Sequence, residues 1–376
     1  MAETLDEKLK IVLNNVAEPV EEFVITIEDV KRILSEKASP IAYIGYEPSG
    51  PIHIGYLPGI EKAKELKEIG FKIKILFADI HAYLNRKGPL DVLREVSLTY
   101  WSEIFKSLGL PFAEFIMGYD FEYDKNYVED LFTLSRHISV HDAWRAMAII
   151  AREAENPRVS QYIYPIMQIL DILYLDVDLA IGGTDQRKIH VLAREEFARK
   201  DLKLNHKVWV PASLHFPLLL GLTGEKMSGS KPRTHIAVHE RPDTIRRKIK
   251  GALCPPDNTD PAVNPIFSYL RFLIFPYVDQ LKIERAEKYG GDIIYKSLDE
   301  LERDYLTGKL HPLDLKNAVA NYIIDRLESA RKRIEQDPDL LKPLAKLQKW
   351  QWERGYIDKE SWKLIRNEYS YYGINI

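Results

Sequence analysis

The chain has 376 residues, of which 45% are hydrophobic, 29% charged and 11% aromatic, and its formal net charge is -3. This length suits two domains with a sizeable core, and the composition excludes a largely disordered chain. The net charge argues against a protein that coats nucleic acid non-specifically, but it leaves open a local basic face for one RNA. The single cysteine, Cys254, excludes an internal disulfide and a multi-cysteine zinc site.

The sequence shows the pattern of neither a signal peptide nor a membrane span. Acidic residues stand in the first segment where a signal peptide needs basic ones, and no apolar run approaches the ~20 residues of a membrane span. A reducing compartment also fits the single cysteine. We therefore expect a cytoplasmic protein with no membrane partner.

The first part of the chain predicts a βαβ unit. Residues 5–37 have the polarity of two short helices, and residues 41–46 form an apolar run of strand length. Apolar residues then recur at three-residue steps from Ile54, which indicates a helix that Gly70 is placed to end. The alternating residues 71–79 predict a second strand. Ligands of such sheets bind at the carboxyl ends of the strands.

The middle of the chain predicts a helical insertion and a second βα step. Residues 90–108 have the pattern of an amphipathic helix. Residues 111–160 lack strand alternation, so we expect them to be helical and inserted between the halves of the sheet. Apolar periodicity returns at residues 164–174, followed by a buried strand at 177–183 and a helix at 186–200.

The last part of the chain is mostly helical in pattern, from residue 242 to residue 333, with turns at 254–257 and 290–292. The final forty or so residues carry too many aromatic side chains for a free tail, so we expect a small helical cap. These aromatic residues are Trp350, Trp352, Tyr356, Trp362, Tyr369, Tyr371 and Tyr372. The predicted domains are 1–228, 229–334 and an extension at 335–376.

The turn EPSGPIHIG, at residues 47–55, joins the first strand to its helix. Gly50 and Gly55 let backbone N–H groups and the helix N-terminus approach phosphate oxygens closely. His53 can then donate to a developing phosphate charge. Taken alone, the same turn is equally well explained as a tight connection capped by a histidine.

A second candidate motif is the glycine-flanked loop KMSGSK, at residues 226–231. Its two lysines and two hydroxyls can close on a triphosphate and stabilise charge as pyrophosphate leaves. Taken alone, it is equally a solvated basic loop.

In this order, and roughly 170 residues apart, the two segments resemble the HIGH and KMSKS signatures of class I aminoacyl-tRNA synthetases. Further segments are similar to archaeal and eukaryotic tyrosyl-tRNA synthetases: YIGYEPSGPIHIG (43–55), FADIHAYLN (77–85), YPIMQILDI (164–172), GGTDQRKIH (182–190) and HPLDLKNAVA (311–320). The resemblance covers roughly residues 25–333. It implies a Rossmann-type α/β catalytic domain with a parallel sheet and a helical insertion, followed by a mainly α-helical anticodon-binding domain.

The resemblance also implies a pocket for L-tyrosine, with contacts from Tyr43, Tyr164, Gln168, Asp171, Gln186 and His81. Tyr43 and Asp171 would hold the phenolic hydroxyl, because phenylalanine would leave buried polar groups unpaired. The seven-residue spacing from Tyr164 to Asp171 places both on one helix face. For His81, a hydrogen-bonded structural role after a strand is the alternative.

For ATP, the resemblance implies contacts from Gly50, His53, Gly55, Tyr56, Lys226 and Met227, and it implies catalytic roles for His53, Lys226, Ser228 and Ser230. Tyr56 and Gly229 depart from the family signatures, each at the fourth position of its motif. Mg²⁺ is expected with the phosphates of ATP, whereas no metal site built by the protein is expected.

For tRNA(Tyr), Arg145, Arg187 and Lys188 fall where the family contacts the acceptor end. Tyr289, His311 and Asp314 fall where it reads the first anticodon base. Cationic side chains can pair with phosphates, an aromatic ring can stack on an unpaired base, and a carboxylate can accept from guanine. A homodimer formed through the insertion is a further implication of the resemblance.

Three alternatives stay open. A tryptophanyl-tRNA synthetase shares the fold and both signatures, but indole offers no hydroxyl to Tyr43 and Asp171. A tRNA-independent nucleotidyltransferase is disfavoured by the segment HPLDLKNAVA. A non-enzymatic RNA-binding paralogue would explain Tyr56 and Gly229 as early decay of the signatures.

Overall fold

The computed structural model describes residues 4–151 and 155–376, which form two compact units. The first unit comprises Met1–Ser49 and Gly59–Leu218, and the second comprises Gly50–Pro58 and Leu219–Ile376. The predicted domain limits after residues 228 and 334 stay a prediction. Part of the predicted insertion, residues 152–154, lies outside the described residues.

The first unit is built on a six-stranded sheet in the order β1-β6-β5-β2-β3-β4. Its strands are β1 (Val24–Ile25), β2 (Ile41–Tyr46), β3 (Lys72–Phe77), β4 (Glu114–Met117), β5 (Leu179–Gly183) and β6 (Ala212–Phe216). All neighbouring strands are parallel except β1 and β6. The central strand β2 pairs with both β3 and β5, so the carboxyl ends of these strands share one edge, as in a Rossmann-type α/β fold.

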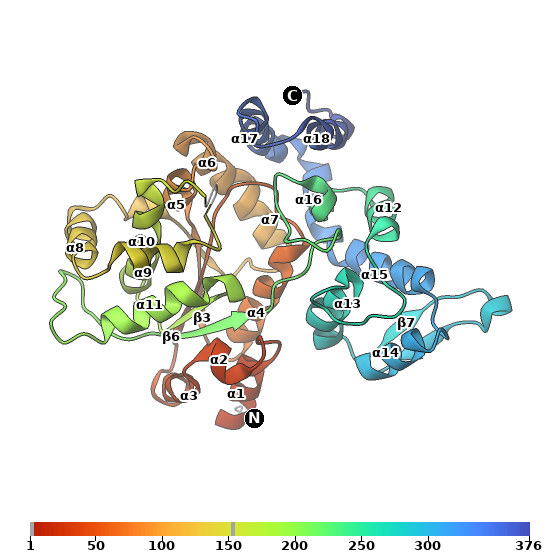
Figure 1. Cartoon of the computed structure of the whole chain (residues 1–376), viewed down its shortest axis with the longest axis horizontal. Coiled ribbons are helices and arrows are strands. Elements are labelled where there is room, and N and C mark those ends of the chain that lie inside the picture. The colour runs from red at the N-terminus through yellow and green to blue at the C-terminus, as the bar shows by residue number, and fades with distance from the viewer. Residues whose placement is uncertain (1–3, 152–154) are drawn as a thin grey trace. The chain divides into compact units, whose positions relative to one another are not determined.

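Helices surround this sheet, and α10 and α11 lie close together beside it in Figure 1. The helices of the first unit are α1 (Leu5–Leu13), α2 (Val20–Phe23), α3 (Ile27–Glu36), α4 (Leu57–Glu68), α5 (Asp79–Leu84), α6 (Leu90–Val96), α7 (Ser102–Ser107), α8 (Lys125–Ser135), α9 (Val140–Met147), α10 (Val159–Tyr174) and α11 (Arg187–Phe197). Gly70 follows α4 with φ +101°, a conformation that favours glycine and ends the helix. The predicted helix at 90–108 contains a π-helical turn at Ser97–Trp101.

Three strands of this sheet were not predicted: the two-residue β1, β4 and β6. β4 lies within the segment expected to be helical. It was missed because only four residues pair, at the edge of the sheet, and they are too few to show alternation. β6, with the sequence ASLHF, alternates over only five residues, and all five are buried, so its pattern was too short to be recognised. The helical expectation for 111–160 is therefore wrong at β4, whereas α8 and α9 agree with it.

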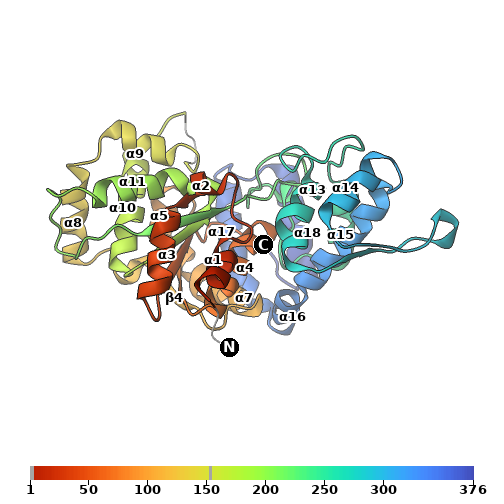
Figure 2. The same ribbon diagram turned by 90° about the horizontal axis from the view of Figure 1, so that it is seen from below.

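The second unit is mainly helical. Its helices are α12 (Pro242–Gly251), α13 (Pro265–Tyr269), α14 (Leu298–Leu306), α15 (Pro312–Arg326), α16 (Glu328–Gln336), α17 (Leu341–Glu353) and α18 (Lys359–Tyr371). An antiparallel hairpin, β7 (Leu281–Ile283) with β8 (Ile293–Tyr295), interrupts them, and Figure 2 shows its loop projecting past α14. The turn expected at 290–292 lies in this hairpin loop, where Gly290 and Gly291 have φ values of 96° and 70°.

The aromatic residues of the extension pack, as expected for a helical cap. Trp352 stacks on Trp362 with ring centroids 4.9 Å apart, and Tyr369 is fully buried. α17 and α18 lie against each other (Figure 1). Across the described parts of the chain, no helix combines the length and apolarity that a membrane crossing needs.

Candidate active site

A pocket in the first unit brings together all six residues expected to bind tyrosine. Its lining is Tyr43, Gly45, Glu47, Ala78, His81, Tyr164, Gln168, Asp171 and Gln186. These side chains come from β2, from α5 and α10, and from the short turn after β5. The pocket therefore lies near the carboxyl ends of adjacent parallel strands, where the βαβ pattern predicts a ligand.

One face of α10 supplies the pocket with Tyr164, Gln168 and Asp171, at the spacing that the sequence indicates. Gln168 Nε2 donates to Gln186 Oε1 at 2.9 Å. Gly182 makes room for this pair, because a Cβ there would lie 2.7 Å from Cβ of Gln186. The two amides are thus held side by side on the pocket wall.

The floor of the pocket is a fully buried Asp171 with partners that sequence reasoning missed. Tyr127 Oη donates to Asp171 Oδ1 at 2.7 Å. His81 stands between two carboxyl groups, with Nε2 3.4 Å from Asp171 Oδ2 and Nδ1 3.4 Å from Glu122 Oε1. Tyr127 and Glu122 lie in the predicted insertion, far from any quoted motif, so their spacing carried no signal.

Burial dominates the electrostatics of this floor. It raises the pKa of Asp171 well above the usual range, and the neighbouring Glu122 raises it further. Burial and then Asp79 raise the pKa of Glu122 in the same way. Protonated or hydrogen-bonded forms of these acids are therefore favoured over a free carboxylate.

The same three side chains, His81, Glu122 and Asp171, could also hold a metal ion. No cluster of this kind was expected from the sequence, because its members are far apart in the chain. The two carboxyl groups approach opposite nitrogens of the His81 ring. One ion cannot bond to both nitrogens of a ring, and neither nitrogen makes a hydrogen bond with a described residue, so the two contacts are charge–dipole or ionic contacts at 3.4 Å.

In the second unit, the turn at Gly50–Pro58 presents His53 as a neutral donor. The Gly55 N–H donates to His53 Nδ1 at 3.1 Å, which leaves the ring proton on Nε2. Burial and then the nearby Lys248 lower the pKa of His53 to about 3. The imidazole is therefore uncharged at neutral pH, and its ring lies 4.6 Å from that of Tyr56.

The His53 turn is hydrogen-bonded to the segment that follows the loop at residues 226–231. The Ile54 N–H donates to Ile236 O and the Val238 N–H to Ile52 O, both at 3.0 Å. At Gly55, an added Cβ would lie 2.9 Å from His53 Nδ1 and 3.1 Å from Met227 Sδ, so only glycine fits without a shift. The structure therefore brings the two motifs together, as their pairing in the sequence predicts.

The loop at residues 226–231 is ordered by its hydroxyl groups. The Ser228 N–H donates to Thr234 Oγ1 at 3.1 Å, and the Ser228 and Ser230 hydroxyls lie 3.1 Å apart. Lys226 is exposed. Gly229 packs against the other signature, because a Cβ on Gly50 would lie 3.3 Å from Cα of Gly229. Close approach of the two backbones thus gives a structural reason for glycine at position 50.

The residues expected at the acceptor end of tRNA lie on α9 and at the start of α11. Arg145 is exposed, with Nη2 3.5 Å from Asp142 Oδ1. Arg187 Nε donates to Glu22 O at 2.9 Å, and Lys188 is exposed.

The residues expected at the anticodon lie on the hairpin and on α15. Tyr289 is 63% exposed, as a stacking ring must be. His311 caps α15 by accepting from the Leu313 N–H at 3.1 Å, and Asp314 is in the first turn of that helix. Arg285 donates to Gly291 O and to Lys309 O, so it ties the hairpin loop to the segment before His311.

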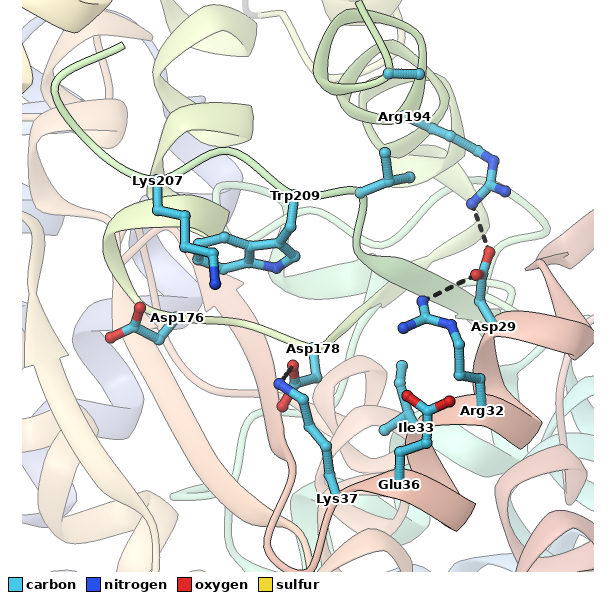
Figure 3. Close-up of a pocket in the computed structure, with 12 residues that line it drawn as sticks. Asp29, Arg32, Ile33, Glu36, Lys37, Asp176, Asp178, Arg194, Lys207 and Trp209 are labelled. Carbon is cyan, nitrogen blue, oxygen red and sulfur yellow. Dashed lines mark hydrogen bonds and ion pairs between the residues drawn. The ribbon is translucent and has the colours of Figure 1, made fainter. Parts of the chain in front are cut away.

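A separate groove of about 530 Å³ lies in the first unit, between α3, α11 and the segment before β6 (Figure 3). Its charges pair with one another: Arg194 Nη1 is 2.7 Å from Asp29, and Lys37 pairs with Asp178. No residue that the sequence singled out lines it. We assign it no part in the site.

Comparison with known proteins identifies the class. Residues 35–328 match the family of tRNA synthetases class I (W and Y), so the chain belongs to this family. It is an enzyme, and ATP is one of its substrates.

Within that family the chain is similar to tyrosine ligases. It is 45% identical to the tyrosine–tRNA ligase of Methanopyrus kandleri over 333 residues, which cover 88% of this chain and 98% of that relative. A tyrosyl-tRNA synthetase complexed with L-tyrosine from Archaeoglobus fulgidus has a TM-score of 0.78 at 42% identity, covering 88% of this chain and 100% of that one. The corresponding structure from Pyrococcus horikoshii has a TM-score of 0.83 at 31% identity, covering 92% of this chain and 100% of that one.

Proposed function

We propose that the chain activates L-tyrosine with ATP, releases pyrophosphate, and transfers the tyrosyl group to the 3′ end of tRNA(Tyr). Specificity for tyrosine is supported by the buried floor of the pocket, where Asp171 contacts Tyr127 and His81. A ligand with a hydroxyl at its far end satisfies this floor, whereas phenylalanine leaves it unpaired. Tyr43 and Asp171 are the proposed partners of the phenol.

In the first step, the tyrosine carboxylate attacks the α-phosphorus of ATP, and the bond to the bridging oxygen of pyrophosphate breaks. His53 donates its Nε2 proton in a hydrogen bond to the phosphate oxygens, while Lys226, Ser228 and Ser230 stabilise the leaving pyrophosphate. ATP enters with Mg²⁺ on its phosphates. The remaining rate acceleration comes from aligning the two substrates, because no side-chain nucleophile is needed.

At the amino-acid end, Tyr164, Gln168 and Gln186 surround the α-amino group. Gln168 and Gln186 are fixed by their mutual hydrogen bond. In the second step, a hydroxyl of the terminal ribose attacks the carbonyl carbon of tyrosyl-adenylate and loses its proton, the bond from that carbon to the phosphate oxygen breaks, and AMP leaves.

For tRNA, Arg145, Arg187 and Lys188 contact the acceptor end, and Tyr289, His311 and Asp314 read the first anticodon base. The exposed ring of Tyr289 suits stacking on an unpaired base. A homodimer through the insertion, acting in the cytoplasm, completes the proposal.

The test is ATP–pyrophosphate exchange with each amino acid in turn, followed by charging of tRNA(Tyr). Exchange with tyrosine and not with tryptophan or phenylalanine is expected. Tryptophan-dependent exchange would overturn the proposal, and normal exchange without charging would point to a tRNA-independent nucleotidyltransferase.

A further inference from the structure

The helices that follow the matched family region pack on the segment next to the signature loop. The family match ends at residue 328, whereas α17 and α18 span Leu341–Glu353 and Lys359–Tyr371. Glu360 of α18 pairs with Arg233, two residues past the loop, at 2.8 Å. This pair is exposed, so it contributes little by itself.

The stronger contacts of α18 are buried. The ring of Tyr369 stacks on His239, with centroids 5.8 Å apart and planes at 15°. Tyr372 Oη donates to His239 O at 2.6 Å. Thr244 Oγ1 donates to Glu368 Oε1 at 2.8 Å, and Arg241 Nε lies 3.7 Å from the other oxygen of Glu368.

The segment that α18 holds is the same segment that joins the two signatures. Residues 236–238 hydrogen-bond to residues 52–54 of the His53 turn, immediately before His239. Thr234 accepts from the Ser228 N–H of the loop. Lys248 Nζ donates to Pro232 O and His235 O, which fixes the start of the segment.

A partly open pocket of about 140 Å³ lies between α18 and this segment, and both sides line it. Several buried polar atoms on its walls have no hydrogen-bond partner among the described residues: His235 Nδ1, His239 Nδ1, Glu240 Oε2, Arg241 Nε and Glu368 Oε2. Burying such groups without a partner costs free energy, and α18 supplies one wall of the pocket that encloses them. The extension therefore sets the environment of the segment behind the signature loop.

We propose that α17 and α18 form a brace that positions the ATP-activating signatures through His239, with Tyr372 and Glu368 as positioning residues. The inference rests on the proposed function, since it concerns the adenylation step. Every tyrosine-pocket residue lies in the first unit, whereas the braced segment and both signatures lie in the second. Loosening the brace should therefore change the use of ATP more than the binding of tyrosine.

The main test is Tyr372→Phe, which removes one buried hydroxyl and keeps the ring. We expect the KM for ATP in tyrosine-dependent exchange to rise about fivefold, the factor that one ordinary hydrogen bond supplies, with the KM for tyrosine unchanged. Tyr371→Phe is the matched control, because Tyr371 is 53% exposed and adjacent in the chain. It should behave as the unaltered enzyme does.

Glu368→Gln is the second variant, since it removes the charge facing Arg241 with little change of shape. A smaller rise in the KM for ATP is expected, and thermal unfolding of each variant separates lost positioning from lost folding. An unchanged KM for ATP in both folded variants, or equal changes for ATP and tyrosine, would overturn the brace. If the unaltered enzyme lacks tyrosine-dependent exchange, the proposed function fails instead.

Discussion

The pocket proposed for tyrosine and the turn that carries His53 present their polar groups in different ways. The pocket relies on side chains buried in the core of the first unit, where burial raises the pKa of Asp171 and Glu122. The turn relies on glycines and backbone hydrogen bonds that place one neutral imidazole, His53. Specificity should therefore be sensitive to near-isosteric changes of side chains, whereas activation should be sensitive to changes of backbone geometry and to loss of His53.

His53→Ala should have the largest effect, because it removes the donor at the phosphates. We expect tyrosine-dependent pyrophosphate exchange to fall by about 10²- to 10³-fold, as for other donors to a developing negative charge. The KM for tyrosine should change little. His141→Ala is a suitable control, since that side chain is 82% exposed on α9. A rate within twofold of the unaltered enzyme would remove His53 from the mechanism.

Asp171→Asn comes next and tests the pocket. The shape is kept while the acceptor for Tyr127 is weakened, so kcat/KM for tyrosine should fall about 10- to 100-fold, the cost of an unpaired buried group. The comparison to make is Asp176→Asn, an exposed position nearby in the chain. If both variants discriminate tyrosine from phenylalanine as before, the floor of the pocket does not set specificity.

Glu122→Gln probes the pH dependence of stability. Burial raises the folded-state pKa of Glu122, so the folded state binds its proton more tightly than the unfolded state does. The unfolding free energy should then decrease as pH rises above the ordinary glutamate value of about 4.3 toward the raised folded pKa. The variant should lose less stability between pH 5 and pH 8, as measured by urea unfolding. Parallel curves for both proteins would contradict a buried acid with a raised pKa.

Gly229→Ser should have the smallest effect, although it changes a signature residue. A Cβ at Gly229 would meet Gly50 Cα and Pro51 Cδ at 3.5 Å, which is ordinary contact. Exchange should stay within about twofold, because a single surface-loop substitution without a clash has little effect. Gly50→Ala should cost more, since its Cβ would lie 3.3 Å from the Gly229 backbone. The reverse ranking would show that backbone contact does not limit this site.

Residue patterns within short segments predicted individual strands and the faces of helices. The apolar run at 41–46 is β2, and the helical spacing of Tyr164 and Asp171 places both in one pocket. The roles of the site residues came from the family resemblance and stay predictions.

Long-range contacts escaped prediction for physical reasons. β4 is a four-residue edge strand without alternation, and the β7–β8 hairpin adds only three residues per strand to a helical region. Tyr127 and Glu122 reach Asp171 only through tertiary packing, since they are separated from it by more than forty residues. The periodicity of helices and strands cannot predict a contact between residues so far apart in the chain.

The membership of Gly50–Pro58 in the second unit has a consequence for synthesis of the chain. A nascent chain that ends at Leu218 already contains every side chain of the tyrosine pocket. It lacks Ile236 and Val238, however, whose backbone groups bond to the His53 turn. During translation, the amino-acid pocket can therefore be assembled well before the activating turn has the partners that hold its shape.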